Sequence, residues 1–202
     1  TRLRLIMTNG NNIKPNKSNI QEILTNELEG PLNIAVLELP NKGLIGITPC
    51  PGRNHTDKLG QIWKRNLQQD LAIIAEWGAD SVLTLLEKKD FDRLGVPNII
   101  EEIKLTGLQC YHLPIPDMDV PGVEFNAAWK KDGEKILQSL RAGGKIIIHC
   151  AAGLGRSGMI AAKILSAFNK TPKIAISSVR GIRPGAIETD PQANFVLHDP
   201  SF

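Results

Sequence analysis

The segment His149-Cys-Ala-Ala-Gly-Leu-Gly-Arg-Ser-Gly158 combines a thiol with a guanidinium six residues later. A cysteine thiolate is a strong nucleophile, and the planar fork of an arginine binds two oxygens of one phosphate. Backbone N–H groups that face into the loop add a positive field for an oxyanion. The segment therefore predicts that Cys150 attacks a bound phosphate ester whose oxygens Arg156 holds. The loop amides expected to bind phosphate belong to Ala151, Ala152, Gly153, Leu154, Gly155 and Arg156.

A strand and a helix have to position this loop. Residues 145–149 form a short apolar run typical of a buried strand, and residues 157–168 have the apolar spacing of a helix. Cys150 is therefore predicted at a strand-to-helix turn, where the free amides of the helix lower the pKa of a thiol. Ser157 can donate a hydrogen bond to the sulfur and so steady a departing thiolate.

The loop resembles the phosphate-binding loop of the cysteine-dependent protein tyrosine and dual-specificity phosphatases. Further segments resemble the kinase-associated phosphatase (cyclin-dependent kinase inhibitor 3) branch of these enzymes, and the resemblance covers roughly residues 44–200. Residues 1–40 carry no such resemblance. The similar segments are, in chain order, 47–52 (ITPCPG), 65–71 (RNLQQDL), 95–98 (GVPN), 112–117 (HLPIPD) and 183–189 (RPGAIET).

The resemblance implies a general acid on a loop upstream of the cysteine, and the chemistry itself requires a proton for the leaving oxygen. Asp117 and Asp119 are the candidates. Asp117 lies four residues before Pro121, which matches the acid-loop spacing of the family, so we favour Asp117. A role of both aspartates in a turn is the alternative, because Asp is common beside Pro and Gly.

The resemblance also implies roles for residues around the loop. Gln192 matches a glutamine that positions the hydrolytic water or the substrate, although a solvated helix glutamine explains it equally well. Glu188 stands where relatives often carry an amide. His149 matches a histidine that supports the loop through hydrogen bonds, so it is not expected to transfer protons. Arg180 and Arg183 are expected to brace the Pro-Gly turn through its carbonyls rather than to face an acidic substrate.

Alternating strand and helix patterns predict an α/β phosphatase fold in one domain, residues 1–202, with 1–40 as an N-terminal extension and 44–200 as the catalytic core. The sheet is expected to be central, mostly parallel and flanked by helices, with the phosphate-binding loop between a strand and a helix. The predicted strands are 33–39, 43–48, 81–86, 108–113 and 145–149, and the predicted helices are 18–29, 59–77, 97–105, 123–142 and 157–168.

Composition excludes several classes of function. A net charge of +3 over 202 residues, without a basic run, gives no case for nucleic-acid binding. No stretch approaches the roughly 20 apolar residues of a membrane span. Three cysteines do not make a disulfide framework, and a thiolate enzyme suits the cytoplasm. His55 with Asp57 lacks a second ligand pair, so neither a metal nor another cofactor is expected.

The predicted function is metal-independent hydrolysis of phosphoproteins, at phosphotyrosine and/or phosphoserine and phosphothreonine, through a phosphocysteine intermediate. The resemblance makes a protein kinase a conceivable partner. One alternative is a catalytically weak, phosphate-dependent kinase-binding module. A phosphoinositide phosphatase is another, which the lack of lysine inside the loop disfavours. A reductase would need Cys50 or Cys110 close to Cys150 in space.

Overall fold

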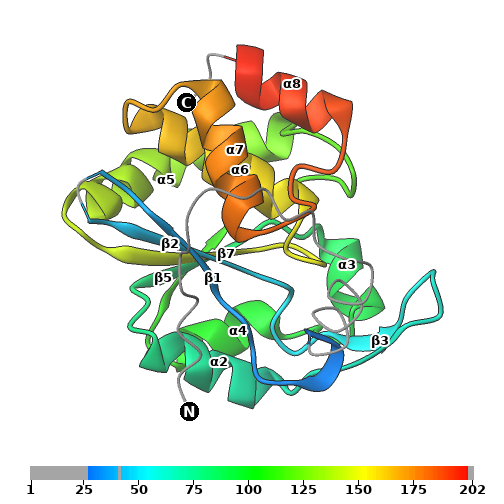
Figure 1. The fold of residues 1–202 in the computed structure, drawn as a ribbon. Coiled ribbons are helices and arrows are strands. Elements are labelled where there is room, and N and C mark those ends of the chain that lie inside the picture. The colour runs from blue at the N-terminus through cyan, green and yellow to red at the C-terminus, as the bar shows by residue number, and fades with distance from the viewer. Residues whose placement is uncertain (1–26, 41, 200–202) are drawn as a thin grey trace, which may run out of the picture.

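A five-stranded sheet with the order β1-β2-β7-β5-β6 forms the centre of the computed structural model (Figure 1), which describes residues 27–40 and 42–199. Only β1 runs antiparallel to its neighbour, and the β2–β7, β7–β5 and β5–β6 pairs are parallel. The predicted central, mostly parallel sheet is therefore confirmed. The strands are β1 (Ala35–Glu38), β2 (Leu44–Thr48), β5 (Ser81–Thr84), β6 (Gln109–His112) and β7 (Lys145–His149).

Helices cover both faces of the sheet (Figure 1). One face carries α5 (Val123–Arg141), α6 (Gly155–Ala167), α7 (Pro172–Ile182) and α8 (Asp190–His198), and the other carries α2 (Leu67–Glu76) and α4 (Ile99–Leu105). The short helix α3 (Lys88–Arg93) follows β5. Successive residues of β7 alternate between the two layers, because strand side chains point to opposite faces: Ile146 and Ile148 pack in one core and Ile147 in the other.

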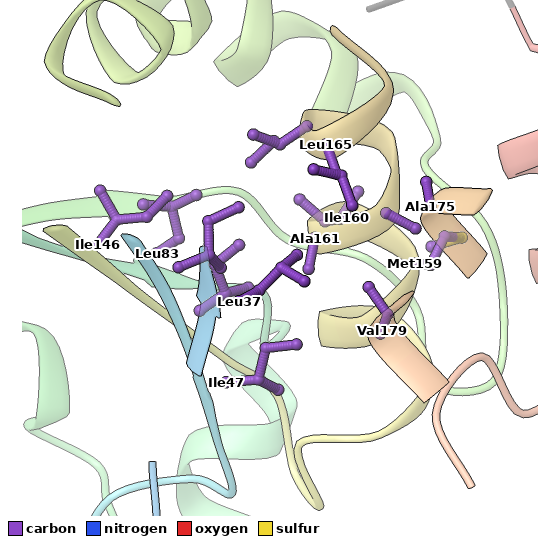
Figure 2. Packing of buried hydrophobic residues seen from close by; sticks show 14 of the residues in the cluster. Leu37, Ile47, Leu83, Ile146, Met159, Ile160, Ala161, Leu165, Ala175 and Val179 are labelled. Atoms are coloured by element: carbon purple, nitrogen blue, oxygen red, sulfur yellow. The ribbon is translucent and has the colours of Figure 1, made fainter. Parts of the chain in front are cut away.

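Helix α6 is the central helix of the larger core. Its residues from Gly155 to Leu165 are all buried. Figure 2 shows Met159, Ile160 and Leu165 of α6 between the strand side chains of Leu37 and Ile146 and those of α7. Because α6 is packed along its whole length, its N-terminus is fixed relative to the end of β7. The loop between these two elements is held at both ends.

The predicted helix over 59–77 is wrong in its first half. Residues 54–64 form a hairpin of β3 (Asn54–Thr56) and β4 (Ile62–Lys64), and helix α2 begins only at Leu67. Leu59 and Trp63 have helical spacing with Leu67, but Leu59 lies 85% exposed at the hairpin tip. Asn66 is the actual start signal, because its side chain accepts a hydrogen bond from the Gln69 amide and caps the helix.

The other predicted elements agree with the structure within a few residues where it describes them. Most of the predicted helix 18–29 lies outside the described residues, and residues 27–29 are helical. The predicted ranges contain none of the helices α3, α7 and α8. None of the helices in the described ranges is long and apolar enough to cross a membrane.

Candidate active site

The loop of residues 150–156 connects the end of β7 to the first turn of α6. Cys150 and Arg156 are both almost fully buried, at 3% and 2% exposure. Gly153 has a φ of 68°, and a Cβ atom there would lie 2.3 Å from the carbonyl oxygen of Thr48. Only glycine fits this position, because it has no Cβ and adopts positive φ freely. The glycine therefore lets the loop turn sharply against the end of β2.

The carbonyl groups of the loop point away from its centre. Ala151 O accepts hydrogen bonds from the Cys50 amide at 3.1 Å and from Arg53 Nη1 at 3.2 Å. Ala152 O and Gly153 O accept from Arg183, at 2.9 Å from Nη2 and 3.1 Å from Nε. In a planar trans peptide, the N–H points opposite to the preceding C=O. The amides that follow these carbonyls therefore face the inside of the loop, where an oxyanion can bind.

The Cys150 thiol is surrounded by groups that favour its ionised form. Burial alone would raise its pKa, but the charge of Arg156, the Ser157 hydroxyl and the amides of Ser157 and Leu154 outweigh burial, so the pKa lies below its ordinary value. Ser157 Oγ is buried and has no hydrogen-bond partner among the described residues. Its hydrogen is therefore free for the sulfur. The surroundings therefore favour the thiolate form of Cys150 more than water would.

His149 is buried and neutral, and it supports the phosphate-binding loop. Its Nε2 lies 2.9 Å from Thr84 Oγ1, and its Nδ1 lies 3.3 Å from the carbonyl oxygen of Cys150. Burial lowers its pKa to about 4, and the nearby Arg156 charge acts in the same direction. The ring is thus engaged with β5 on one side and with the loop backbone on the other, which agrees with the expected supporting role.

The guanidinium of Arg156 is shared between two aspartates. Nη1 donates to Asp90 Oδ2 at 2.9 Å and to the carbonyl of Ile115 at 3.1 Å, while Nη2 lies 2.8 Å from Asp117 Oδ1. Asp90 is 1% exposed and also binds Arg93 at 2.6 Å. Burial opposes ionisation of Asp90, but Arg93 and Arg156 keep its pKa below the ordinary value. Asp90 therefore fixes one edge of the guanidinium, and the other edge faces the pocket.

The two acid candidates differ in their position relative to the pocket. A pocket of about 310 Å³ lies over the loop, and Cys150, Arg156 and Asp117 line it. Asp117 is 46% exposed there. Asp119 does not line this pocket, and its carboxylate accepts a hydrogen bond from the Val120 amide. The structure thus brings Asp117, but not Asp119, to the thiol and the arginine.

Gln192 and Glu188 form the wall of the pocket next to the start of α6. Gln192 is buried, with its Oε1 accepting from the Glu188 amide at 3.0 Å and its Nε2 donating to Asp119 O at 3.3 Å. Glu188 lies at the pocket mouth, where loss of hydration raises its pKa although the Gly155 amide favours the carboxylate. A Cβ on Gly155 would lie 2.5 Å from Glu188 Oε2. The carboxylate therefore sits directly against the loop.

The hairpin β3–β4 supplies the opposite wall through Asp57, Lys58 and Leu59. Asp57 organises the turn, because its carboxylate accepts from the Leu59 and Gln61 amides and from Trp63 Nε1. Figure 1 shows the hairpin projecting from the rest of the molecule. This role explains Asp57 without a metal, and the described residues contain no group of three or more His, Cys, Asp or Glu placed to hold one.

The arginines of the Pro-Gly turn have two different roles. Arg180 braces the turn as expected, donating to Ala186 O at 3.1 Å and Ile187 O at 3.0 Å. Arg183 braces the phosphate-binding loop instead. Sequence reasoning missed the supporting residues Asp90 and Arg53, because each comes from a separate segment and no local pattern marks it.

The remaining cysteines are free thiols. Cys50 lies next to the loop through its amide, but it is fully buried and burial raises its pKa. Burial also raises the pKa of Cys110, on β6. Thiols held in the protonated form are poor nucleophiles, so neither shows the properties of a resolving thiol.

The chain is similar in sequence to known phosphatases. The model of the family described as cyclin-dependent kinase inhibitor 3 (CDKN3) matches residues 14–176. Cyclin-dependent kinase inhibitor 3 of Mus musculus is 30% identical over 178 residues, which cover 86% of this chain and 80% of that protein. Tyrosine-protein phosphatase CDC14 of Saccharomyces cerevisiae is 39% identical over 97 residues, which cover 48% of this chain and 17% of that protein.

Solved structures with the same fold include kinase associated phosphatase (KAP) with its catalytic-site cysteine substituted by serine. It superposes with a TM-score of 0.71 at 28% identity, covering 82% of this chain and 92% of that one. The active form of Tk-PTP superposes with a TM-score of 0.57 at 27% identity, covering 75% and 88% of the two chains.

Proposed function

The chain belongs to the cyclin-dependent kinase inhibitor 3 family and has the fold of the protein tyrosine phosphatases, and from this premise we propose that it hydrolyses phosphoprotein monoesters through a phosphocysteine intermediate. The observation that carries the proposal is the convergence of Cys150, Arg156 and Asp117 on one pocket. A relative whose structure was solved with its catalytic-site cysteine substituted supports the same choice of nucleophile.

In the first step, the Cys150 thiolate attacks phosphorus and the bond from phosphorus to the leaving oxygen breaks. Arg156 and the inward amides of residues 151–156 hold the non-bridging oxygens, where negative charge is concentrated. Asp117, as the carboxylic acid, gives its proton to the leaving oxygen, and the dephosphorylated side chain departs as an alcohol or phenol. A bound phosphate competes with Asp117 for Arg156 Nη2, which releases the carboxyl group toward the leaving oxygen.

In the second step, water attacks phosphorus and the sulfur–phosphorus bond breaks. The Asp117 carboxylate takes the proton from water, and the products are inorganic phosphate and the Cys150 thiolate. Ser157 stabilises the departing sulfur, and Gln192 positions the water or the substrate. The guanidinium and the amides supply the positive field, so the scheme needs no metal.

The substrate that we propose is a phosphorylated protein kinase. The relatives named cyclin-dependent kinase inhibitor 3, and the solved kinase associated phosphatase, support a kinase partner. The unpaired cysteines and the reactive thiolate fit a reducing compartment, and we propose the cytoplasm.

The test measures hydrolysis of para-nitrophenyl phosphate and of phosphotyrosine and phosphothreonine peptides in the presence of a chelator. We compare the wild type with Cys150→Ser, Asp117→Asn and the matched control Asp119→Asn. We expect no turnover by Cys150→Ser. Asp117→Asn should hydrolyse the peptides about 10² to 10⁴-fold more slowly than the wild type, as expected for removal of a general acid. Asp119→Asn should hydrolyse them at the wild-type rate.

Turnover by Cys150→Ser at the wild-type rate would exclude the phosphocysteine route. If the wild type binds phosphate but hydrolyses none of the substrates, the chain is a phosphate-dependent binding module instead. Faster hydrolysis of phosphoinositides than of both phosphopeptides would replace the proposed substrate class.

A further inference from the structure

The phosphate-binding loop depends on Arg183 for its shape. Arg183 donates to two successive loop carbonyls, Ala152 O and Gly153 O. These bonds hold the carbonyls outward and therefore hold the amides of Gly153 and Leu154 inward. A displacement of Arg183 would free both peptide groups to rotate, and the loop would lose two of the donors that face a bound phosphate.

Arg183 is itself buried, at 5% exposure, and needs a counter-charge. In the described part of the chain its ion-pair partner is Glu27, whose two carboxylate oxygens accept from Nη1 and Nη2, the latter at 3.1 Å. Both side chains are 6% exposed. Removing one partner of such a buried pair leaves an uncompensated charge, which is strongly unfavourable.

Glu27 is in turn fixed from behind. Its carbonyl accepts a hydrogen bond from Arg65 Nη1, and Arg65 binds both carboxylate oxygens of Asp70 at 2.7 and 2.8 Å. Asp70 also accepts from the Gly52 amide at 2.9 Å. Glu27 thus lies between α2 and Arg183 with both its backbone and its carboxylate held, although it precedes the first strand of the sheet.

We propose that Glu27 is a positioning residue for the phosphate-binding loop, acting through Arg183, so that this residue ahead of β1 contributes to the catalytic unit. The inference deepens the proposed function and rests on it for its effect on turnover. Its effect on anion binding and on Cys150 reactivity stands without turnover. Glu27 does not touch the substrate, and its contribution is the orientation of the Gly153 and Leu154 amides.

The test compares Glu27→Gln, which removes the charge and keeps the size, with Glu29→Gln, an exposed glutamate of the same segment. Three quantities are measured on the full chain: the dissociation constant of orthovanadate, the pH dependence of Cys150 alkylation by iodoacetate followed on the Cys150 peptide, and kcat/KM. We expect Glu27→Gln to weaken orthovanadate binding about tenfold and to lower kcat/KM at least as much, because small misplacements of binding groups are costly. The alkylation midpoint should move to higher pH.

Glu29→Gln should match the wild type in all three measurements. A combined Glu27→Gln, Arg183→Gln variant should lose no more orthovanadate affinity than Arg183→Gln alone, since both changes break one chain of contacts. Where Glu27→Gln is unfolded at the assay temperature, Glu27→Asp, which keeps the charge but shortens the reach, serves in the same measurements with a smaller expected loss.

The inference is overturned if Glu27→Gln lowers the melting temperature but leaves orthovanadate affinity and the alkylation profile unchanged, since Glu27 would then be only a structural residue. It is also overturned by equal losses in Glu27→Gln and Glu29→Gln. If the wild type binds orthovanadate without hydrolysing any substrate, the proposed function fails, while the orthovanadate and alkylation arms still decide the role of Glu27.

Discussion

Arg156 forms ion pairs with two aspartates of the site. Asp90 binds one side of its guanidinium in a fully buried contact, and Asp117 binds the other side at the pocket. The two aspartates are not equivalent, because only the exposed one can be displaced by a substrate. Asp90 therefore sets the plane of the guanidinium, and in the proposed mechanism a phosphate takes the place of Asp117 at Nη2.

Asp90→Asn should lower both activity and stability, although Asp90 does not line the pocket. The amide keeps the shape but removes the charge that holds Arg156 and Arg93. We expect kcat/KM to fall about tenfold, and the free energy of unfolding to fall by about 3 kcal/mol, as for a broken buried ion pair. Steady-state kinetics and urea unfolding measure the two effects.

The matched control is Asp92→Asn, an exposed aspartate of the same helix. Its kinetics and stability should equal those of the wild type. Wild-type kcat/KM in Asp90→Asn would show that Ile115 O and the pocket suffice to orient the guanidinium.

Glu188 should make substrate binding depend on pH. Partial loss of hydration raises its pKa, so the carboxyl group carries its negative charge only above that raised value. The charge lies against the loop and repels a phosphate dianion. We expect KM to rise as pH increases through this titration, and Glu188→Gln to remove the rise and lower KM about twofold at neutral pH.

The measurement is KM against pH for para-nitrophenyl phosphate, with Asp190→Asn as an exposed control from the start of α8. A Glu188→Gln profile that overlays the wild-type profile would show that the Glu188 charge does not reach the phosphate.

The central residues of the site could be predicted from the sequence because they are close together in it. Cys150, Arg156 and Ser157 belong to one short loop, and Asp117 has a recognisable spacing before a proline. Asp90 and Glu27 could not be predicted, since their partners lie 66 and 156 residues away. Long-range pairs of this kind leave no periodic pattern along the chain.

At the scale of elements, the β3–β4 hairpin lies outside the central sheet and contributes Asp57, Lys58 and Leu59 to the pocket wall. Trp63 lies on the inner side of the hairpin and is 4% exposed. The guanidinium carbon of Arg53 lies 3.7 Å from the centre of the Trp63 ring. Arg53 in turn binds the loop carbonyl of Ala151. The hairpin is thereby connected to the phosphate-binding loop by one arginine.

Removal of the Asp57 carboxylate should open the hairpin. Asp57→Ala deletes three hydrogen bonds, from Leu59, Gln61 and Trp63, each worth about 1 kcal/mol. We expect faster hydrogen exchange in residues 54–64. We also expect a larger loss of kcat/KM for phosphopeptides than for para-nitrophenyl phosphate, if the hairpin wall of the pocket is where the larger substrates bind.

Lys64→Ala, an exposed change on the same hairpin, should alter neither quantity. Equal losses for the large and the small substrate in Asp57→Ala would mean that the hairpin acts on the loop through Arg53 instead of on the substrate.

The hairpin is also where element prediction failed. Apolar residues at 59, 63, 67 and 71 have the period of a helix, but a spacing of four does not show whether a turn interrupts it. The buried strands were predictable because a short apolar run bounded by turn residues is typical of a buried strand. The turn at Asp57 was not, since its hydrogen bonds depend on side-chain geometry.

For the whole molecule, buried His149 should make stability fall in acid. Its pKa is about 4 in the folded chain and about 6.5 when unfolded. Between these values the unfolded chain binds a proton that the folded chain does not, so this contribution is fully present above pH 6.5 and is lost toward pH 4. The expected loss in the free energy of unfolding is about 3 kcal/mol.

Urea unfolding at several pH values between 7 and 4 checks this, comparing the wild type with His149→Gln. The variant should show a shallower fall, whereas His198→Gln, at an exposed position, should follow the wild type. Parallel curves for all three proteins would assign the acid sensitivity to other groups.

The position of β7 has a consequence for how the molecule is made. It is the last of the described strands along the chain but lies in the middle of the sheet, between β2 and β5. A nascent chain that has emerged only as far as α5 can form the β1–β2 and β5–β6 pairs, each with an open edge that invites aggregation. Arrival of β7 closes both edges at once, and the nucleophile follows it directly. Synthesis therefore completes the sheet and delivers the reactive cysteine in the same event.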